Sequence, residues 1–144
     1  MDIKEERRFS ISEDSIDFHS FGLASAFNFL IGNRDWNIAA SRNAKLFYKP
    51  STGNYIVIPY DFDYANIVGA TYRRENLAKS MLHPFDRIYE GEYFKTRAGD
   101  ILKVFSMHEK SILDQLISVE NPLPEERRQK IRKYFENWFD LVKK

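Results

Sequence analysis

The sequence predicts an α+β fold that is mostly helical and forms a single domain over residues 1–144. Three observations predict it. The C-terminal segment repeats apolar residues at helical spacing, an early segment is apolar around most of a helix, and two runs rich in β-branched and aromatic residues flank a turn. Helices and strands therefore occupy separate parts of the chain, which is typical of the α+β class.

The composition fits a folded domain with its own core. Of the 144 residues, 43% are hydrophobic and 15% aromatic, which is enough to fill the core of one domain. The chain has 22 Lys and Arg against 21 Asp and Glu, so its net charge of +1 gives no global field to attract nucleic acid or an anionic membrane. The absence of cysteine excludes a disulfide framework, a Cys-ligated zinc site and thiol catalysis. No apolar run approaches the ~20 residues of a membrane span, so neither nucleic acid nor membrane is an expected partner.

The first predicted helix runs from about Glu13 to Leu30. Ser12 is the predicted N-cap, and Gly32 with Asn33 gives a C-terminal stop signal. Apolar residues cover most of its circumference, which is typical of a helix buried at the centre of a domain.

Two predicted strands follow an irregular polar loop over residues 33–42. They span 44–48 and 55–58, and a turn over 50–54 that contains Pro, Gly and Asn separates them. Because the strands are so close in sequence, a β-hairpin is expected, and Pro59 ends its second strand.

The rest of the chain is predicted to be a C-terminal helical bundle. A loop with a short helix near 76–82 leads to a short helix over 84–95, a longer helix over 100–119 and a break at 121–124. The helix over 125–142 is the clearest, because an apolar stripe repeats along one side of it: Ile131, Tyr134, Phe135, Trp138, Phe139 and Val142.

Oxygen-bearing side chains gather around the predicted hairpin. The stretch 32–63 contains Asn33, Asp35, Asn37, Asn43, Asp61 and Asp63. The hairpin should bring its two flanking loops, and with them Asp35 and Asp61, to the same edge of the domain. Two carboxylates at one edge repel each other unless a cation lies between them or one keeps a proton. Carboxylate and amide oxygens suit magnesium or manganese better than zinc.

A structural interpretation of these residues is equally open at this point. Asn, Asp and Gly are common turn formers, so residues 32–35 could simply cap a helix and residues 59–63 could be a polar strand end. The order of elements favours a functional interpretation: a buried helix, an Arg-Asp loop, an Asn, two strands around a turn, and Asp-Phe-Asp.

This order resembles the C-terminal lobe of the protein-kinase-like fold. There, a catalytic loop with an Asp and then an Asn precedes a β-hairpin and a segment whose Asp holds magnesium. The chain is similar to the atypical branch of HipA-type and CotH-type kinases, because Asn33-Arg34-Asp35 and Tyr60-Asp61 match their catalytic-loop and metal-binding elements. The matching motifs cover about residues 13–63, and the remainder resembles the lobe only in its helical character.

The resemblance implies roles for the matching residues. Asp35 would be the catalytic residue that accepts or orients the proton of the attacking hydroxyl group. Asn43 and Asp61 would hold the magnesium that bridges the ATP phosphates. Asp63 stands where most kinases have Gly, and would be a second metal ligand or a structural cap.

The spacing of the loop leaves the choice of amide ligand open. Asn43 follows Asp35 by eight residues, which is longer than in the protein-kinase catalytic loop. Asn37 is therefore the alternative metal ligand. Asn33, Asn37 and Lys45 are assigned by the resemblance to nucleotide contacts.

The implied function is Mg²⁺-dependent transfer of a phosphoryl group from ATP to a hydroxyl acceptor, with Mg²⁺ and ATP as cofactors. The residues ahead of the first helix are too few for a nucleotide-capping N-terminal lobe, so a missing lobe is an expected partner and the chain is either a fragment or a lobe with another role. The alternatives are a non-catalytic binding or structural module that keeps the fold, and a metal-dependent hydrolase. The chain as it begins at Met1 is expected in the cytoplasm; an export signal removed ahead of Met1 would make it an exported protein.

Overall fold

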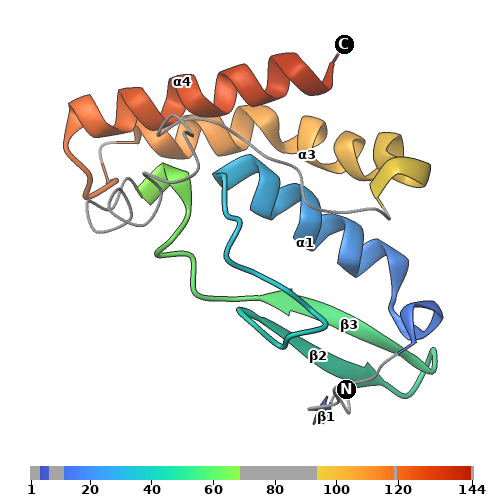
Figure 1. Cartoon of the computed structure of the whole chain (residues 1–144). Coiled ribbons are helices and arrows are strands. Elements are labelled where there is room, and N and C mark those ends of the chain that lie inside the picture. Colours follow the sequence, from blue (N-terminus) through green and yellow to red (C-terminus); the bar gives the residue numbers. More distant parts are fainter. Residues whose placement is uncertain (1–3, 7–11, 69–93, 119, 144) are drawn as a thin grey trace, which may run out of the picture. The chain divides into compact units, whose positions relative to one another are not determined.

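The computed structural model describes residues 4–6, 12–68, 94–118 and 120–143. Within these residues the fold is α+β and mostly helical, with a three-stranded antiparallel sheet and three α-helices (Figure 1). This confirms the predicted class. The chain divides into two compact units, Met1–Arg97 and Ala98–Lys144.

The sheet of the first unit has the strand order β1-β2-β3, formed by β1 (Lys4–Glu6), β2 (Ala44–Lys49) and β3 (Asn54–Pro59). β2 and β3 make the predicted hairpin, with Ala44 opposite Pro59 at one end and Lys49 opposite Asn54 at the other. Gly53 has a φ of 71°, the left-handed conformation that a residue without Cβ adopts most easily. β1 was not predicted, because its charged residues join the sheet through backbone pairing with β2.

Helix α1 (Phe18–Ile31) packs against β3 and supplies one side of the core of this unit. Ala24 of the helix lies against Ala44, Leu46 and Val57 of the strands, with Phe21 and Trp36 among the residues around them. Alternate strand residues point to opposite faces, so the neighbours of Leu46 and Val57 in sequence lie on the face away from α1. Figure 1 shows α1 lying along one face of the sheet.

The predicted start of this helix at Glu13 is wrong. Residues Glu13–Ser15 form a 3₁₀ turn, and Ile16 pairs with Tyr55 of β3 in an isolated parallel bridge. The backbone at Ile16 therefore pairs with the sheet before the helix begins. Asp17, and not Ser12, is the N-cap: its side chain accepts a hydrogen bond of 2.7 Å from the backbone N–H of Ser20. The predicted stop is confirmed, because Gly32 caps the helix with a φ of 67°.

The second unit is an antiparallel pair of helices, formed by α3 (Phe94–Ile117) from Ala98 onwards and by α4 (Glu125–Val142). The ring of Trp138 packs edge-on against Phe105, with centroids 5.6 Å apart. Near the break between the helices, Nη1 of Arg128 donates to the backbone oxygen of Ser118 at 2.8 Å. The apolar stripe of α4 is thus a core face, as its spacing predicts.

The remaining helix predictions concern residues 76–119. Helix α3 begins at Phe94, ahead of the predicted Asp100. The short helices predicted near 76–82 and over 84–95 fall outside the described residues, apart from residues 94 and 95. Within the described part of the chain, no helix combines the length and the apolar character needed to cross a bilayer.

Candidate functional site

Two loops meet at the end of the hairpin where β2 begins and β3 ends. The first runs from α1 to β2 and the second follows β3. The backbone N–H of Tyr60 donates to the oxygen of Asn43 at 3.0 Å, which extends the β2–β3 pairing into both loops. Farther along, Asn66 donates to the oxygen of Gly32 at 3.1 Å and so ties the second loop to the C-terminus of α1. Because the strands are antiparallel, residues 43 and 60 are neighbours although they lie far apart in sequence, and Asp61 follows directly.

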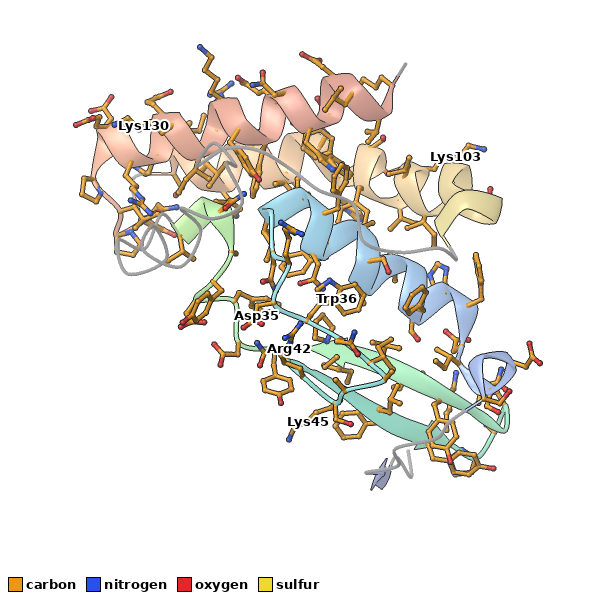
Figure 2. The ribbon with its side chains drawn as sticks, viewed as in Figure 1. Asp35, Trp36, Arg42, Lys45, Lys103 and Lys130 are labelled. Carbon is orange, nitrogen blue, oxygen red and sulfur yellow. The ribbon has the colours of Figure 1, made fainter. Side chains whose placement is uncertain are left out.

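Asp35 is held by hydrogen bonds on both its backbone and its carboxylate. Nδ2 of Asn43 donates to the Asp35 backbone oxygen at 2.7 Å and to its Oδ2 at 3.0 Å. Nε of Arg42 lies 3.2 Å from the other carboxylate oxygen, Oδ1. Figure 2 shows Asp35 and Arg42 next to each other beside the hairpin, with Trp36 directed towards α1. The position and orientation of the Asp35 carboxylate are thus fixed by two neighbouring side chains.

A buried ladder of two amide side chains, those of Asn28 and Asn33, connects helix α1 to the backbone of Asp35. Nδ2 of Asn28 donates to the oxygen of Ala24 inside α1, and its Oδ1 accepts from Nδ2 of Asn33, each at 2.8 Å. Oδ1 of Asn33 in turn accepts the backbone N–H of Asp35 at 3.1 Å. Asn28 and Asn33 are only 1% and 3% exposed. Asn33, predicted as a nucleotide contact, is therefore buried and its amide is engaged within the protein.

The backbone bridge between Asn37 and Arg42 accounts for the long spacing of the loop. Each residue donates its N–H to the oxygen of the other at 2.8 Å, which closes residues 38–41 into a turn. The oxygen of the Asn37 side chain accepts the N–H of Ala40 at 2.7 Å. Of the two amides predicted as alternative metal ligands, Asn43 lies against Asp35, and Asn37 shapes an exposed turn.

Asp61 and Asp63 form a carboxylate pair in the second loop. A side-chain hydrogen bond with Asp63, and then the like charge of Asp63, raise the pKa of Asp61 above its usual value; slight desolvation and the more weakly felt charge of Asp35 act in the same direction, against a backbone hydrogen bond that lowers it. Asp61 has a φ of 57°, a conformation that Asp tolerates better than most residues. Asp63 therefore dominates the surroundings of the Asp61 carboxyl, and the charge of Asp35 acts on it more weakly.

These residues form an open set of ligands. Among the described residues, no group of three or more His, Cys, Asp or Glu is close enough to enclose a metal ion. Magnesium rarely needs such a cage, because it is commonly bound by one or two carboxylates together with substrate phosphates and water. The carboxylates of Asp61 and Asp63 and the amide oxygen of Asn43 are the types of oxygen that such binding uses.

Lys45 lies apart from this group. Its neighbours Ala44 and Leu46 face α1, so Lys45 points to the opposite face of the sheet. There its ammonium group lies over the ring of Tyr60, with Nζ 5.7 Å from the centroid. Figure 2 shows Lys45 projecting away from Asp35 and Arg42.

Two residues of this site were missed by the sequence reasoning. Arg42 gave no signal beyond its place next to Asn43, because an ion pair across a loop has no local pattern. Asn28 did give one: it is a polar residue in the middle of a strongly apolar helix. A buried amide must find partners, so its presence marks a local hydrogen-bond network.

No family model, curated protein or solved structure matches this chain.

Proposed function

We propose that this chain is the catalytic lobe of an atypical kinase-like phosphotransferase. It transfers a phosphoryl group from ATP to a hydroxyl acceptor and depends on Mg²⁺. One observation carries the proposal: Asn43 holds the Asp35 carboxylate and also pairs with Tyr60, so that the loop of Asp35 meets the loop of Asp61 and Asp63 at one end of the hairpin. The HipA-like and CotH-like motifs of the sequence favour the same reaction class.

Each residue has a role that its surroundings support. Asp35 acts on the proton of the acceptor hydroxyl, since its carboxylate is oriented and 33% exposed. Nδ2 of Asn43 donates both hydrogen bonds that its side chain makes to Asp35. The amide oxygen Oδ1 takes no part in these bonds and suits a cation. Asp61 and Asp63 supply the charged oxygens. The hydrogen bond with Asp63, and then the like charge of Asp63, raise the pKa of Asp61, and a divalent cation between the two carboxylates would take the place of the proton that they share.

In this proposal the protein and the nucleotide together supply the ligands of the metal ion. Two carboxylates and an amide leave several positions of an octahedral ion open, and phosphate oxygens of ATP would occupy some of them. Positioning and charge stabilisation supply most of the catalysis in phosphoryl transfer. The chain needs to contribute little beyond a fixed set of oxygens and an oriented carboxylate.

A binding experiment tests the metal and nucleotide site. The whole chain is titrated calorimetrically with MgCl₂ alone, with ATP alone, and with ATP in millimolar MgCl₂. We expect ATP to bind only in the presence of Mg²⁺, and we expect the Asp61→Asn substitution to abolish this Mg²⁺-dependent binding of ATP. Asp140→Asn is the matched control, because Asp140 is an exposed carboxylate of α4. Binding of ATP that is absent at millimolar concentrations, or that is the same in Asp61→Asn, would overturn the proposal.

A turnover measurement tests the assignment of Asp35. Release or transfer of the γ-phosphoryl group of radiolabelled ATP is followed in the wild type and in Asp35→Asn. Removing a general base lowers turnover by about 10²–10⁴-fold. The affinity for Mg²⁺ with ATP should stay within a few-fold of wild type, since Asp35 is not assigned to the metal. Equal turnover in both proteins would exclude Asp35 from the chemistry.

A further inference from the structure

The ion pair between Arg42 and Asp35 uses only a small part of the arginine. Nε is the atom that lies 3.2 Å from Oδ1 of Asp35. The terminal nitrogens, which carry the remaining N–H donors of the guanidinium group, have no hydrogen-bond acceptor within the part of the chain that the structure describes. The side chain is 56% exposed. Asp35 thus orients the planar guanidinium group of Arg42, and the fork formed by its two terminal nitrogens faces solvent.

The backbone beneath this fork is held firmly. Both hydrogen bonds of the bridge to Asn37 are 2.8 Å long. The residues on either side, Ser41 and Asn43, have φ values of 49° and 51°, so the chain bends sharply on both sides of Arg42. Asn43 is fixed in turn by its two bonds to Asp35. A guanidinium group on such a base loses less conformational freedom on binding an anion than one on a mobile loop.

The charge balance at the site calls for a cation at this place. Asp35, Asp61 and Asp63 all lie in the two loops that meet at this end of the hairpin, where Tyr60 is bonded to Asn43. ATP brings several further negative charges, and one divalent ion offsets only part of them. Arg42 is in direct contact with Asp35, one of these three carboxylates, whereas Lys45 lies on the other face of the sheet.

We propose that Arg42 is a phosphate-contacting residue of this loop. While Nε stays on Asp35, the terminal N–H groups donate to phosphate oxygens of the bound nucleotide. Arginine suits this task because its fork matches two phosphate oxygens at once, which the ammonium group of lysine cannot do. The inference rests on the proposed function and adds a residue that recognises the polyphosphate of the substrate.

The experiment uses inorganic tripolyphosphate as the probe, because it presents the phosphate chain without the nucleoside. The whole chain is titrated with MgCl₂ alone and then with tripolyphosphate in millimolar MgCl₂. We expect Arg42→Gln to weaken tripolyphosphate binding about tenfold, since charge-assisted hydrogen bonds to phosphate are lost. Arg42→Lys should fall between wild type and Arg42→Gln. Lys103→Gln, which removes an exposed positive charge from α3, should bind as wild type does.

A double substitution separates direct contact from a positioning role. If Arg42 acts only by orienting Asp35, Arg42→Gln has no further effect in a protein that already carries Asp35→Asn. If Arg42 touches the phosphates, Arg42→Gln still weakens tripolyphosphate binding about tenfold in that background. Arg42→Lys keeps the test usable if Arg42→Gln fails to fold, and circular dichroism checks each variant.

The outcomes distinguish this inference from the proposed function. Wild-type tripolyphosphate affinity in Arg42→Gln and Arg42→Lys, with Mg²⁺-dependent ATP binding intact, overturns the inference alone. A loss that disappears in the Asp35→Asn background also overturns it. Absence of Mg²⁺-dependent binding of both ATP and tripolyphosphate in the wild type overturns the proposed function together with the inference.

Discussion

The side-chain amide of Asn43 donates to both the backbone oxygen and a carboxylate oxygen of Asp35, at 2.7 and 3.0 Å. The two residues are separated by a turn that the Asn37–Arg42 bridge closes. Asn43 adopts a φ of 51°, which Asn tolerates better than most residues. One amide therefore fixes both the main chain and the side chain of the residue that we propose acts on the substrate hydroxyl.

Replacing Asn43 with Asp should destabilise the first unit. Asp tolerates the same backbone conformation, but it removes both donors and places a second negative charge against Asp35. We expect the free energy of unfolding at neutral pH to fall by about 2 kcal/mol, the usual cost of losing hydrogen bonds to a charged group. Urea denaturation measures it. Asn43→Gly, which removes the amide without adding charge, should cost less, and wild-type stability in Asn43→Asp would show that these bonds do not hold the loop.

Substituting Asn28 with Leu should break the buried ladder. The Leu side chain is of similar size, but it leaves Nδ2 of Asn33 without its acceptor in a site that is 3% exposed. An unsatisfied buried donor costs about 1–3 kcal/mol, so the urea midpoint should fall while the slope of the transition stays the same. The control is Asn137→Leu at an exposed position of α4, expected within about 0.5 kcal/mol of wild type. A similarly small change in Asn28→Leu would contradict the ladder's structural role.

Asp61→Asn should change how stability depends on pH. The pKa of Asp61 is raised above 3.8 in the folded protein, so the folded state binds this proton more tightly than the unfolded state. Wild-type stability therefore decreases as pH rises through the interval between 3.8 and the raised value. Asn lacks this titration and suits the φ of 57°. We expect the variant to melt at a higher temperature than wild type above that interval, and at a similar one below it.

Added Mg²⁺ provides the complementary measurement for Asp61. A ligand that binds only the folded state raises the melting temperature, so millimolar MgCl₂ should stabilise the wild type and not Asp61→Asn. The effect in the wild type should weaken as pH falls through the raised pKa, because protons compete with the metal. A melting temperature of the wild type that does not respond to Mg²⁺ at neutral pH would contradict this prediction.

Trp138 should be the most sensitive position of the second unit. Its side chain is fully buried and packs edge-on against Phe105 and Phe139. Trp138→Ala should lower the free energy of unfolding by about 3–5 kcal/mol, mainly through the cavity it leaves. Trp138→Phe should cost far less, because the indole Nε1 has no hydrogen-bond acceptor within the described residues. Equal losses in the two variants would mean that the indole nitrogen contributes a bond of its own.

Local patterns predicted most of the elements. The apolar stripe of 131–142 marks α4, and the β-branched runs around Gly53 mark the hairpin, because helical and alternating periodicities are written in the chain itself. The start of α1 and the strand β1 escaped this reasoning. Ile16 and Lys4–Glu6 take extended conformations through pairing with residues remote in sequence, and such pairing leaves no local signature.

For the candidate site, the residue types could be predicted from the sequence and their arrangement could not. The residue types on which the proposed chemistry depends are present in the sequence, since Asp35, Asp61 and Asp63 are carboxylates of the kind that a magnesium site would use. The spacing left Asn37 and Asn43 as alternatives, and only the folded loop shows that Asn43 lies against Asp35.

The sequence by itself determined most of the helices and strands and the residue types of the candidate site, because helix stops, turns and hydrophobic periodicity act over a few residues. The tertiary structure alone decided which side chains meet. Antiparallel pairing of β2 with β3 brings the loops of Asn43 and Asp61 together, and in the loop that the Asn37–Arg42 bridge closes, Nε of Arg42 lies against Asp35. The first of these contacts joins two loops and depends on the pairing of β2 with β3, whereas the second joins residues of one loop and depends on the turn that the Asn37–Arg42 bridge closes.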